Sequence, residues 1–486
     1  MRLHVKTLLP LIFLVCLYGQ MAAQEQIGLR LGNYTGINSV HINPAWAVGS
    51  SFDWDVNIVA AGGFATTNYA FVENARLPQL WSGNDILWRP DLASDVPVDS
   101  SALIADAFPG STNRFAFAKA FATLPSVLFR VNGHTLGISM RLRTEGSFPA
   151  IPGTLSYYAL DTLDIGDRIL VNPFKGAGMA WSEIGLTYGN SYTLDSERRI
   201  DFGVSLKYLQ GYEGYYLQNV NPIDLTWTLQ DTATLQSLDA RLGYATNIQF
   251  NEDGTTQDYQ FQQNGSGWSM DLGASYVIMD QQTGKPRLRL GVALLDVGKI
   301  NFRSNAAAHQ LRIDSSFLVN LNDYESIDTR EELVALASSQ VFGDSAQSLV
   351  ADQFALWLPT AISLQADVAV HQNIYVSASW VRRLTVGEQG VQRANSLAIT
   401  PRFETRALEA GVPMSWTNGR QFRMGTYVRL GPLTMGTDKL GGWLTKQNTL
   451  NGADFYVALK VNPFWNINGG QGRSRGKSGQ VKCYNF

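Results

Sequence analysis

The sequence predicts an all-β fold, namely a closed antiparallel transmembrane β-barrel of about 14 strands with long external loops. Three observations predict it: many segments alternate with a period of two, short and long connections take turns, and no segment after the chain start offers the ~18 apolar residues of a membrane helix. Charged residues make up only 16% of the 486 residues, whereas aromatic residues reach 11% and glycine occurs 45 times. Since an average soluble domain carries about 25% charged residues, this composition favours a large, glycine- and aromatic-rich β protein.

The charge balance and the cysteine count exclude several classes of protein. Lys plus Arg (38) nearly equals Asp plus Glu (41), so neither a basic nucleic-acid-binding domain nor an acidic disordered chain is indicated. Only two cysteines are present, which excludes a disulfide framework. We therefore expect no nucleic-acid partner.

The start of the chain has the layout of a secretory signal peptide. A basic segment, 1–6, precedes the apolar run Leu8–Tyr18, and the small residues Ala22 and Ala23 follow. A membrane anchor is the alternative interpretation, but the run is too short to cross ~30 Å of lipid. Cleavage near this point predicts export and leaves Cys483 as the single thiol of the mature chain.

The alternation of apolar with polar residues locates the strands and indicates that each strand has two different faces. From Ile200 to Tyr208, apolar residues alternate with polar or small residues, and the pattern recurs from Leu136 to Leu142 and from Ile362 to Val368. The expected strands lie at about 52–72, 113–131, 134–143, 182–190, 199–210, 268–278, 287–300, 360–370, 373–383, 394–404, 406–416, 421–430, 432–438 and 453–463. Gly62-Gly63 and Pro125 interrupt the first two, so 16 strands remain an alternative.

The connections sort by length along the chain. Asn132-Gly133 is a strong two-residue hairpin signal, and other short links alternate with longer connections at 73–112, 144–181, 211–267, 303–358 and 438–452. This order is typical of an outer-membrane barrel with short periplasmic turns and long external loops. The strands of a soluble β-sandwich also alternate apolar and polar residues, but nothing requires its short and long connections to lie at opposite ends. Within 303–358, Thr329 followed by Glu331-Glu332 predicts the start of a helix.

Aromatic and charged residues fit the two environments of such a barrel. Five aromatic residues near strand ends are expected in the interfacial girdles, although a soluble β core is the alternative: Trp54, Tyr208, Trp380, Trp416 and Phe455. Eight charged residues share the polar face, and these are Asp53, Asp55, Asp201, Asp271, Glu409, Arg141, Lys207 and Arg423. We expect them to line the lumen, where they could also tune a polar pathway.

No catalytic, cofactor or metal site is predicted. The five histidines, at 4, 41, 134, 309 and 371, lack metal spacing and are expected in loops or turns, and no Gly-x-Ser-x-Gly elbow occurs. Gly476-Lys477-Ser478 lacks the earlier glycine of a phosphate-binding loop. Asn251–Gly254 resembles part of a calcium loop, but Gln249 and Gln260 occupy the first and twelfth positions of that loop, so a turn is expected there. We expect a protein that is not an enzyme.

Several motifs resemble a known family. Asn43-Pro44-Ala45 resembles the element that opens barrels of the long-chain fatty-acid transporter superfamily. Four later stretches, Gly203–Gly211, Asp271–Tyr276, Leu294–Ile300 and Gly431–Asp438, are similar to an uncharacterised Bacteroidota outer-membrane barrel family within it. The resemblance implies a fourteen-stranded barrel whose N-terminal segment plugs the lumen, and kinship with the shuttle barrel of type IX secretion. It implies no catalytic residues.

The expected organisation is a signal peptide at 1–24, a plug segment at 25–50, a transmembrane barrel at 51–465 and a flexible basic periplasmic tail at 466–486. The leading hypothesis is a non-enzymatic component of envelope assembly or protein secretion in the bacterial outer membrane. Its expected partners are outer-membrane lipids and machinery proteins that bind the external loops or residues 469–486. The alternative is a transporter for hydrophobic molecules, which an apolar pocket in the lumen would favour.

Overall fold

The computed structural model describes residues 26–462 apart from 82–84, 90–101, 111, 162, 230–231, 250–258, 315, 325–326, 328 and 419–420. The expected signal peptide, the turn at 251–254, Gly476-Lys477-Ser478 and the tail at 466–486 lie outside the described residues.

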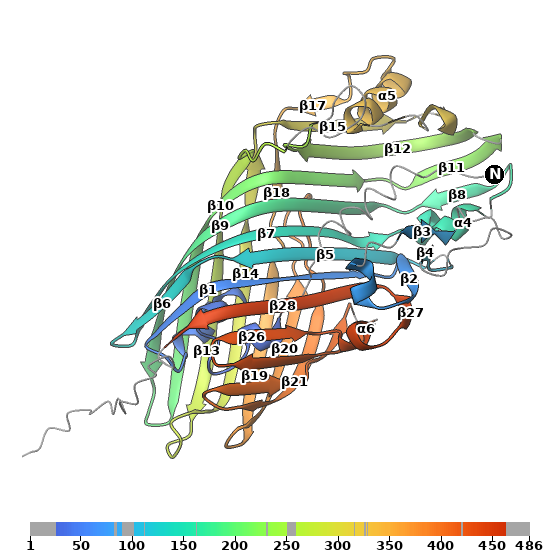
Figure 1. Cartoon of the computed structure of the whole chain (residues 1–486). Coiled ribbons are helices and arrows are strands. Elements are labelled where there is room, and N and C mark those ends of the chain that lie inside the picture. Colours follow the sequence, from blue (N-terminus) through green and yellow to red (C-terminus); the bar gives the residue numbers. More distant parts are fainter. Residues whose placement is uncertain are drawn as a thin grey trace, which may run out of the picture.

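Fourteen antiparallel strands close into a barrel, as the sequence predicts (Figure 1). In order around the barrel they are β1 (Trp54–Thr67), β5 (Arg114–Thr123) continued by β6 (Ser126–Val131), β7 (His134–Ile151), β9 (Phe174–Thr193), β10 (Arg198–Asn219), β13 (Gly265–Met279), β14 (Pro286–Phe302), β19 (Ala361–His371), β20 (Ile374–Arg383), β21 (Ser396–Glu404), β22 (Leu408–Gly411) continued by β23 (Met414–Thr417), β24 (Gln421–Met424) continued by β25 (Thr426–Leu430), β26 (Leu433–Thr437) and β28 (Gly452–Val461). The ring closes where β28 pairs with β1, from Val56 opposite Val461 to Thr66 opposite Gly452.

The two breaks expected in the first strands have different outcomes. Pro125 does separate β5 from β6, because proline cannot donate a ladder hydrogen bond. Both pieces pair with β1 and with β7, so the break adds no strand to the ring. β1 itself runs through Gly62-Gly63 without interruption. The sixteen-strand alternative is therefore wrong.

The long connections contain more regular structure than the alternation indicates. β9 and β10 extend past the ring, and β12 (Thr232–Ala245) pairs with the outer part of β10. Around them lie β8 (Arg168–Val171), β11 (Ile223–Leu229), β15 (Ala306–Ile313), β16 (Phe317–Asn320), β17 (Leu349–Ala351) and β18 (Phe354–Trp357). A separate small sheet has the order β27 (Gln447–Leu450), β2 (Ala70–Ala75), β4 (Leu103–Ala107) and β3 (Ile86–Trp88). Alternation does not predict these external strands, which form because strands that continue beyond the ring keep their pairing partners.

Short helices complete the external connections. They are η2 (Leu77–Trp81), η4 (Gly153–Leu155), α4 (Tyr157–Asp161), η5 (Leu321–Tyr324), α5 (Arg330–Phe342) and α6 (Leu440–Leu444). The predicted helix start is confirmed, since the Thr329 hydroxyl accepts a hydrogen bond from the Glu332 backbone N–H at 3.2 Å. Within the described part of the chain, no helix is both long and apolar enough to cross a membrane.

The outer surface of the barrel is apolar and the inner surface is polar. On β7, Leu136 and Ile138 are 59% and 45% exposed, whereas Arg141 and Arg143 on the same strand are buried. Exposed leucine, isoleucine, valine and aromatic side chains continue this belt on the other strands. Trp54, Trp380 and Trp416 are exposed, whereas Tyr208 and Phe455 are half-buried. An apolar belt on a closed barrel is the surface of a protein that spans a membrane.

Replacing Leu272 by arginine tests this assignment. Leu272 lies in the middle of β13 and is 41% exposed, so an arginine there would face lipid and should lower the free energy of unfolding by about 2–4 kcal/mol. The matched control is Leu318→Arg on the external strand β16, where a leucine that is 61% exposed faces water and the change should be small. Guanidinium titration in lipid bilayers measures both. Equal effects of the two substitutions would contradict the position of the belt.

Candidate functional site

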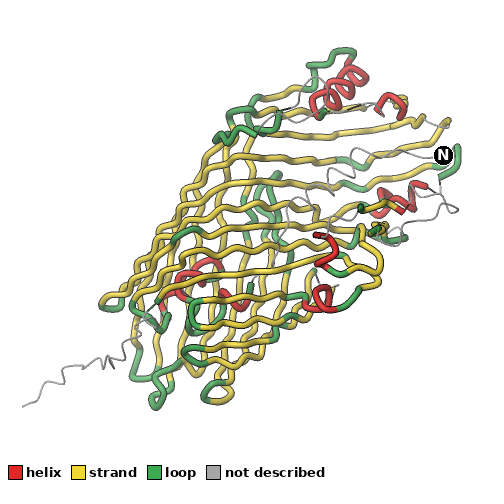
Figure 2. The backbone as a smooth tube through the Cα atoms, in the orientation of Figure 1, coloured by secondary structure: helices red, strands yellow, loops and turns green. Residues whose placement is uncertain are grey.

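The barrel interior holds the N-terminal segment, here called the inner segment (residues 26–50). It forms three short helices, α2 (Ile27–Arg30), η1 (Gly36–His41) and α3 (Pro44–Val48). Figure 2 shows these helices within the ring of strands. Nearly every side chain described in this segment is buried, polar ones included. The segment therefore occupies the lumen in the half of the barrel that carries the short turns.

Three glycines on neighbouring strands form a flat surface under α3. Gly189 of β9 pairs with Gly203 of β10, which pairs with Gly273 of β13. A Cβ atom on these glycines would lie 2.2 Å from Val48 Cγ2, 2.5 Å from the Ala45 backbone nitrogen and 2.1 Å from Asn43 Oδ1, respectively. Real Cβ atoms do not approach so closely, so only glycine lets the inner segment lie directly on the wall.

Asn43 and Arg289 fasten the two ends of α3. Asn43 Oδ1 accepts a hydrogen bond from the Ala45 N–H at 2.9 Å, which caps the helix, and its Nδ2 donates to Gln365 Oε1 at 2.9 Å. Arg289 donates to the carbonyl oxygens of Ala45 and Trp46 at 3.0 and 2.7 Å and stacks on the Trp46 ring at 4.0 Å. The Asn-Pro-Ala motif thus positions the inner segment against β14 and β19.

A second attachment joins the inner segment to the strands at which the ring closes. Lys460 of β28 pairs with Asp55 of β1 at 3.0 Å and donates hydrogen bonds to the carbonyl oxygens of Tyr34 and Thr35 at 3.1 and 2.6 Å. Asp55 in turn accepts a hydrogen bond from the Ile37 N–H at 2.8 Å. These contacts satisfy a buried ion pair with backbone groups, which is the condition under which such pairs are tolerated.

Deeper in the lumen lies a group of ionised side chains, here called the central charge cluster. It comprises Arg143, Glu145, Glu183, Lys207, Asp271, Asp296 and Arg393. Asp296 is its hub, because its carboxylate accepts from Arg143 at 3.0 Å, Lys207 at 2.8 Å and Arg393 at 2.7 Å. Asp296 has φ +54 and its backbone N–H donates to Asp271 at 2.7 Å, beside a register shift between β13 and β14. This irregular backbone directs the carboxylate into the lumen.

His41, at the end of η1, is buried beside this cluster. Burial, and then the nearby guanidinium groups of Arg141 and Arg30, lowers the pKa of His41 well below its usual range. The imidazole is therefore neutral at physiological pH, and it adds no further cation to a region already rich in them.

An external connection folds back into the barrel from the other side. Residues 384–395, here called the external loop, link β20 to β21, and in their second half Val391, Arg393 and Ala394 are buried. The Trp357 N–H of β18 donates to the Gln389 carbonyl at 3.1 Å, and the Val391 N–H donates to the Trp357 carbonyl at 3.1 Å. Further along, the Gln392 N–H donates to Ser147 Oγ at 2.8 Å. The external loop thus occupies the lumen in the half opposite the short turns.

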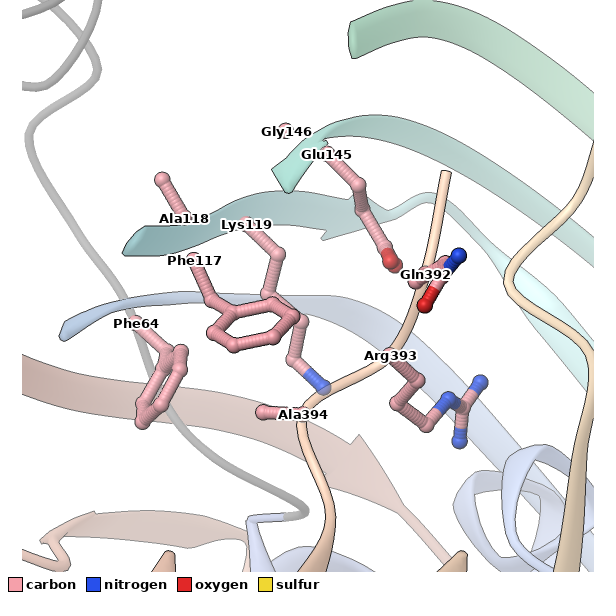
Figure 3. Close-up of a pocket in the computed structure, with 9 residues that line it drawn as sticks. All are labelled: Phe64, Phe117, Ala118, Lys119, Glu145, Gly146, Gln392, Arg393 and Ala394. Carbon is pink, nitrogen blue, oxygen red and sulfur yellow. The ribbon is translucent and has the colours of Figure 1, made fainter. Parts of the chain in front are cut away.

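A pocket lies between the external loop and the barrel wall (Figure 3). It is small and partly open to solvent, and the space in which the centre of a water molecule fits is about 20 Å³. Its lining is Phe64, Phe117, Ala118, Lys119, Glu145, Gly146, Gln392, Arg393 and Ala394. The Phe64 and Phe117 rings lie on one side of the external loop and the Arg393 side chain points to the other. The pocket therefore combines an apolar wall with charged groups next to the central charge cluster.

Most of the charged residues expected in the lumen are found there. Asp55, Asp201, Asp271, Glu409, Arg141, Lys207 and Arg423 are all buried in the interior. Asp53 is the exception, because its side chain is 83% exposed and pairs with Arg130 at 3.2 Å near the end of the barrel. Sequence reasoning missed Asp296 and Arg393, which lie outside regular alternation. It also placed His41 and His309 in loops or turns, which is wrong, since His41 lies in η1 and His309 lies within β15. Among the described residues, no group of three His, Cys, Asp or Glu side chains could hold a metal ion.

Comparison with known proteins gives one family and several structural neighbours. The profile of a family of unknown function, DUF5723, matches residues 44–438. No curated protein matches. The toluene transporter TodX of Pseudomonas putida aligns with a TM-score of 0.40 at 10% identity, covering 88% of this chain and 94% of that one. TbuX, a toluene transporter of Ralstonia pickettii, aligns with a TM-score of 0.40 at 10% identity over 89% and 95%. A FadL homologue of Pseudomonas aeruginosa has a TM-score of 0.23 at 9% identity over 91% and 99%.

Proposed function

The chain belongs to the DUF5723 family of unknown function, and we propose that it is a gated outer-membrane transporter for hydrophobic molecules. The observation that carries the proposal is the pocket between the external loop and the wall, because Phe64, Phe117, Ala118 and Ala394 give it an apolar side next to the charged side chains of the lumen. Concave sites with apolar walls and a few polar groups are where small apolar molecules bind. The inner segment separates this pocket from the other end of the barrel, so passage would require a gate.

Uptake by a Gram-negative host that lacks its own long-chain fatty-acid transporter tests the proposal. Radiolabelled toluene and radiolabelled oleate serve as probes, and expression of the full chain should raise uptake of at least one. Phe117→Asp puts a charge into the apolar wall and should abolish the gain. The matched control, Phe261→Asp, changes a phenylalanine that is 70% exposed outside the barrel and should leave uptake unchanged. No uptake of either probe by a correctly folded, surface-exported chain would reject the proposal.

A second candidate is a non-enzymatic role in envelope assembly or protein secretion, with a type IX link. The external sheet formed by β8, β11, β12 and β16 favours it, because Leu170 and Leu318 are 53% and 61% exposed on strands that lie beyond the ring. Exposed leucines on a sheet suit protein contacts. Native mass spectrometry of the protein from its own membranes separates the two roles: a stoichiometric protein partner supports assembly, and a retained apolar molecule supports transport.

A further inference from the structure

We propose that the external loop is a second closure of the barrel, in series with the inner segment, and that the ion pair between Arg393 and Asp296 holds it in place. The inference deepens the proposed function and rests on it for what passes through the lumen. The closure itself is a property of the barrel, and its test does not depend on the transported molecule.

The sequence of the external loop suits an inward position. Gly387 has φ +71, and a Cβ atom there would lie 2.1 Å from Trp357 Nε1. A Cβ atom on Gly390 would lie 2.7 Å from the Trp357 carbonyl oxygen. Both glycines therefore allow the loop to approach β18 and to form the isolated bridge between Trp357 and Gly390. A loop that only covered the outside of the barrel would not need this close approach.

The inward end of the external loop carries two kinds of anchor. Val391 is 3% exposed and packs in an apolar cluster that includes Trp181 and Leu356. Two residues later, Arg393 reaches Asp296 at 2.7 Å, in the middle of β14. The loop thus attaches both to an apolar surface and to the hub of the central charge cluster.

The contacts of Asp296 allow Arg393 and the external loop to leave the central charge cluster without disrupting the rest of it. When Arg393 leaves, the Asp296 carboxylate keeps Arg143 and Lys207 as partners, so it is not left as an unpaired buried charge. Arg393, on a loop that continues to exposed residues, can regain water outside the barrel. Desolvation offsets most of the attraction in a buried ion pair, so exchange of this one contact for water is inexpensive.

The position of the loop relative to the pocket gives the closure its role. Gln392, Arg393 and Ala394 of the loop form one wall of the pocket, and the Phe64 and Phe117 rings form the other (Figure 3). Outward movement of the loop would open the pocket to the exterior while the inner segment still blocks the other end. Two closures in series allow one end to open at a time.

Ion conductance in planar lipid bilayers, with potassium chloride as the probe, tests the two closures separately in the full chain. Gly390→Leu with Arg393→Gln displaces the external loop, and Gly203→Leu displaces the inner segment. The loop variant alone, or Gly203→Leu alone, should conduct about as well as the unaltered protein. The variant with all three substitutions should conduct at least ten times more. If Gly203→Leu alone conducts as well as the triple variant, the loop is not a closure. A folded triple variant that does not conduct would equally overturn the inference.

Matched controls and a second inner-segment variant keep this test falsifiable. Gly178→Leu with Arg382→Gln repeats the two residue changes of the loop variant at positions outside the external loop. A Cβ atom on Gly178 would meet nothing nearer than 3.8 Å, and Arg382 is exposed. A protein that carries these two substitutions together with Gly203→Leu should therefore not conduct. Gly189→Leu replaces Gly203→Leu if the latter fails to fold, because its Cβ atom would meet Val48. Mobility in gels before and after heating verifies that each barrel is folded.

A disulfide tests the closure during transport. The 2.8 Å hydrogen bond between residues 392 and 147 brings them within reach of a disulfide, so Ser147→Cys with Gln392→Cys, in a Cys483→Ser background, should lock the loop. Toluene or oleate uptake should fall to background after oxidation and return with dithiothreitol, while uptake by either single-cysteine variant should not respond to oxidation or to dithiothreitol. Equal uptake by the oxidised and reduced forms would overturn the closure. Absence of uptake in both, with the expected conductance, would reject transport and leave the closure standing.

Discussion

Replacing Asp296 by alanine is expected to lower the free energy of unfolding by about 3–5 kcal/mol. The Asp296 carboxylate accepts hydrogen bonds from Arg143, Lys207 and Arg393, all of them nearly inaccessible to water. Its removal leaves three buried cations with only Glu145, Glu183 and Asp271 to balance them. Guanidinium titration of the barrel in lipid bilayers, followed by tryptophan fluorescence, measures the loss.

Two substitutions show whether this loss comes from the buried charge. Asp296→Asn keeps the shape and part of the hydrogen bonding but not the charge, so it should be nearly as destabilising as alanine. Asp314→Ala removes a carboxylate that pairs with Arg312 at 3.1 Å on the surface, where water screens the charges, and stability should hardly change. A small effect of both Asp296 variants would mean that the cations find other partners and that Asp296 is not the hub.

Replacing Gly203 by leucine is expected to expel residues 43–48 from the barrel wall while the ring of strands stays intact. A Cβ atom at this position would lie 2.5 Å from backbone atoms of Pro44 and Ala45, and backbone cannot rotate away as a side chain can. Overpacking of this kind costs typically 1–3 kcal/mol, and here the inner segment can leave instead of straining the strand. Amide hydrogen exchange in residues 26–50 should become at least about tenfold faster, in line with a loss of ~1.4 kcal/mol or more.

The control for this variant is Gly178→Leu on β9. Its Cβ atom would meet nothing nearer than 3.8 Å, so the same change of residue type should leave exchange in the inner segment unaltered. Exchange in β10 and in its partners β9 and β13 should stay slow in both variants, because the ladder hydrogen bonds do not involve the inner segment. Protection of residues 43–48 that survives Gly203→Leu would show that the three glycines do not position α3.

The ring of strands could be predicted because its cause is local. Lipid on one side and the lumen on the other impose a period of two on every strand. The alternation of apolar with polar or small residues is therefore visible within nine consecutive residues, as from Ile200 to Tyr208. The same argument places Asp55 and Lys207 in the lumen without any knowledge of their partners. It fails for β12 and β15, whose two faces meet neither lipid nor lumen in a regular way.

The interior could not be predicted because its contacts are remote in sequence. Arg143 and Asp296 are 153 residues apart, and Asn43 and Gln365 are 322 apart, so neither pairing leaves a local pattern. Asp296 also lies at a register shift, where alternation is interrupted and gives no face assignment. In the external loop, two glycines and a lone Arg393 are an ordinary turn composition, and their inward direction depends on Trp357, which precedes them by thirty residues or more.

The pairing of Lys460 with Asp55 has a consequence for biogenesis. Lys460 belongs to the last strand and Asp55 to the first, and the same ammonium group holds the carbonyl oxygens of Tyr34 and Thr35. The inner segment therefore gains this attachment only after β28 has paired with β1. A segment that is synthesised before the strands thus depends on the strand that closes the ring. Loss of the ammonium group of Lys460 would leave the buried Asp55 carboxylate without its cation and would remove a donor from the carbonyl oxygens of Tyr34 and Thr35, so closure of the ring and attachment of the inner segment would be weakened together.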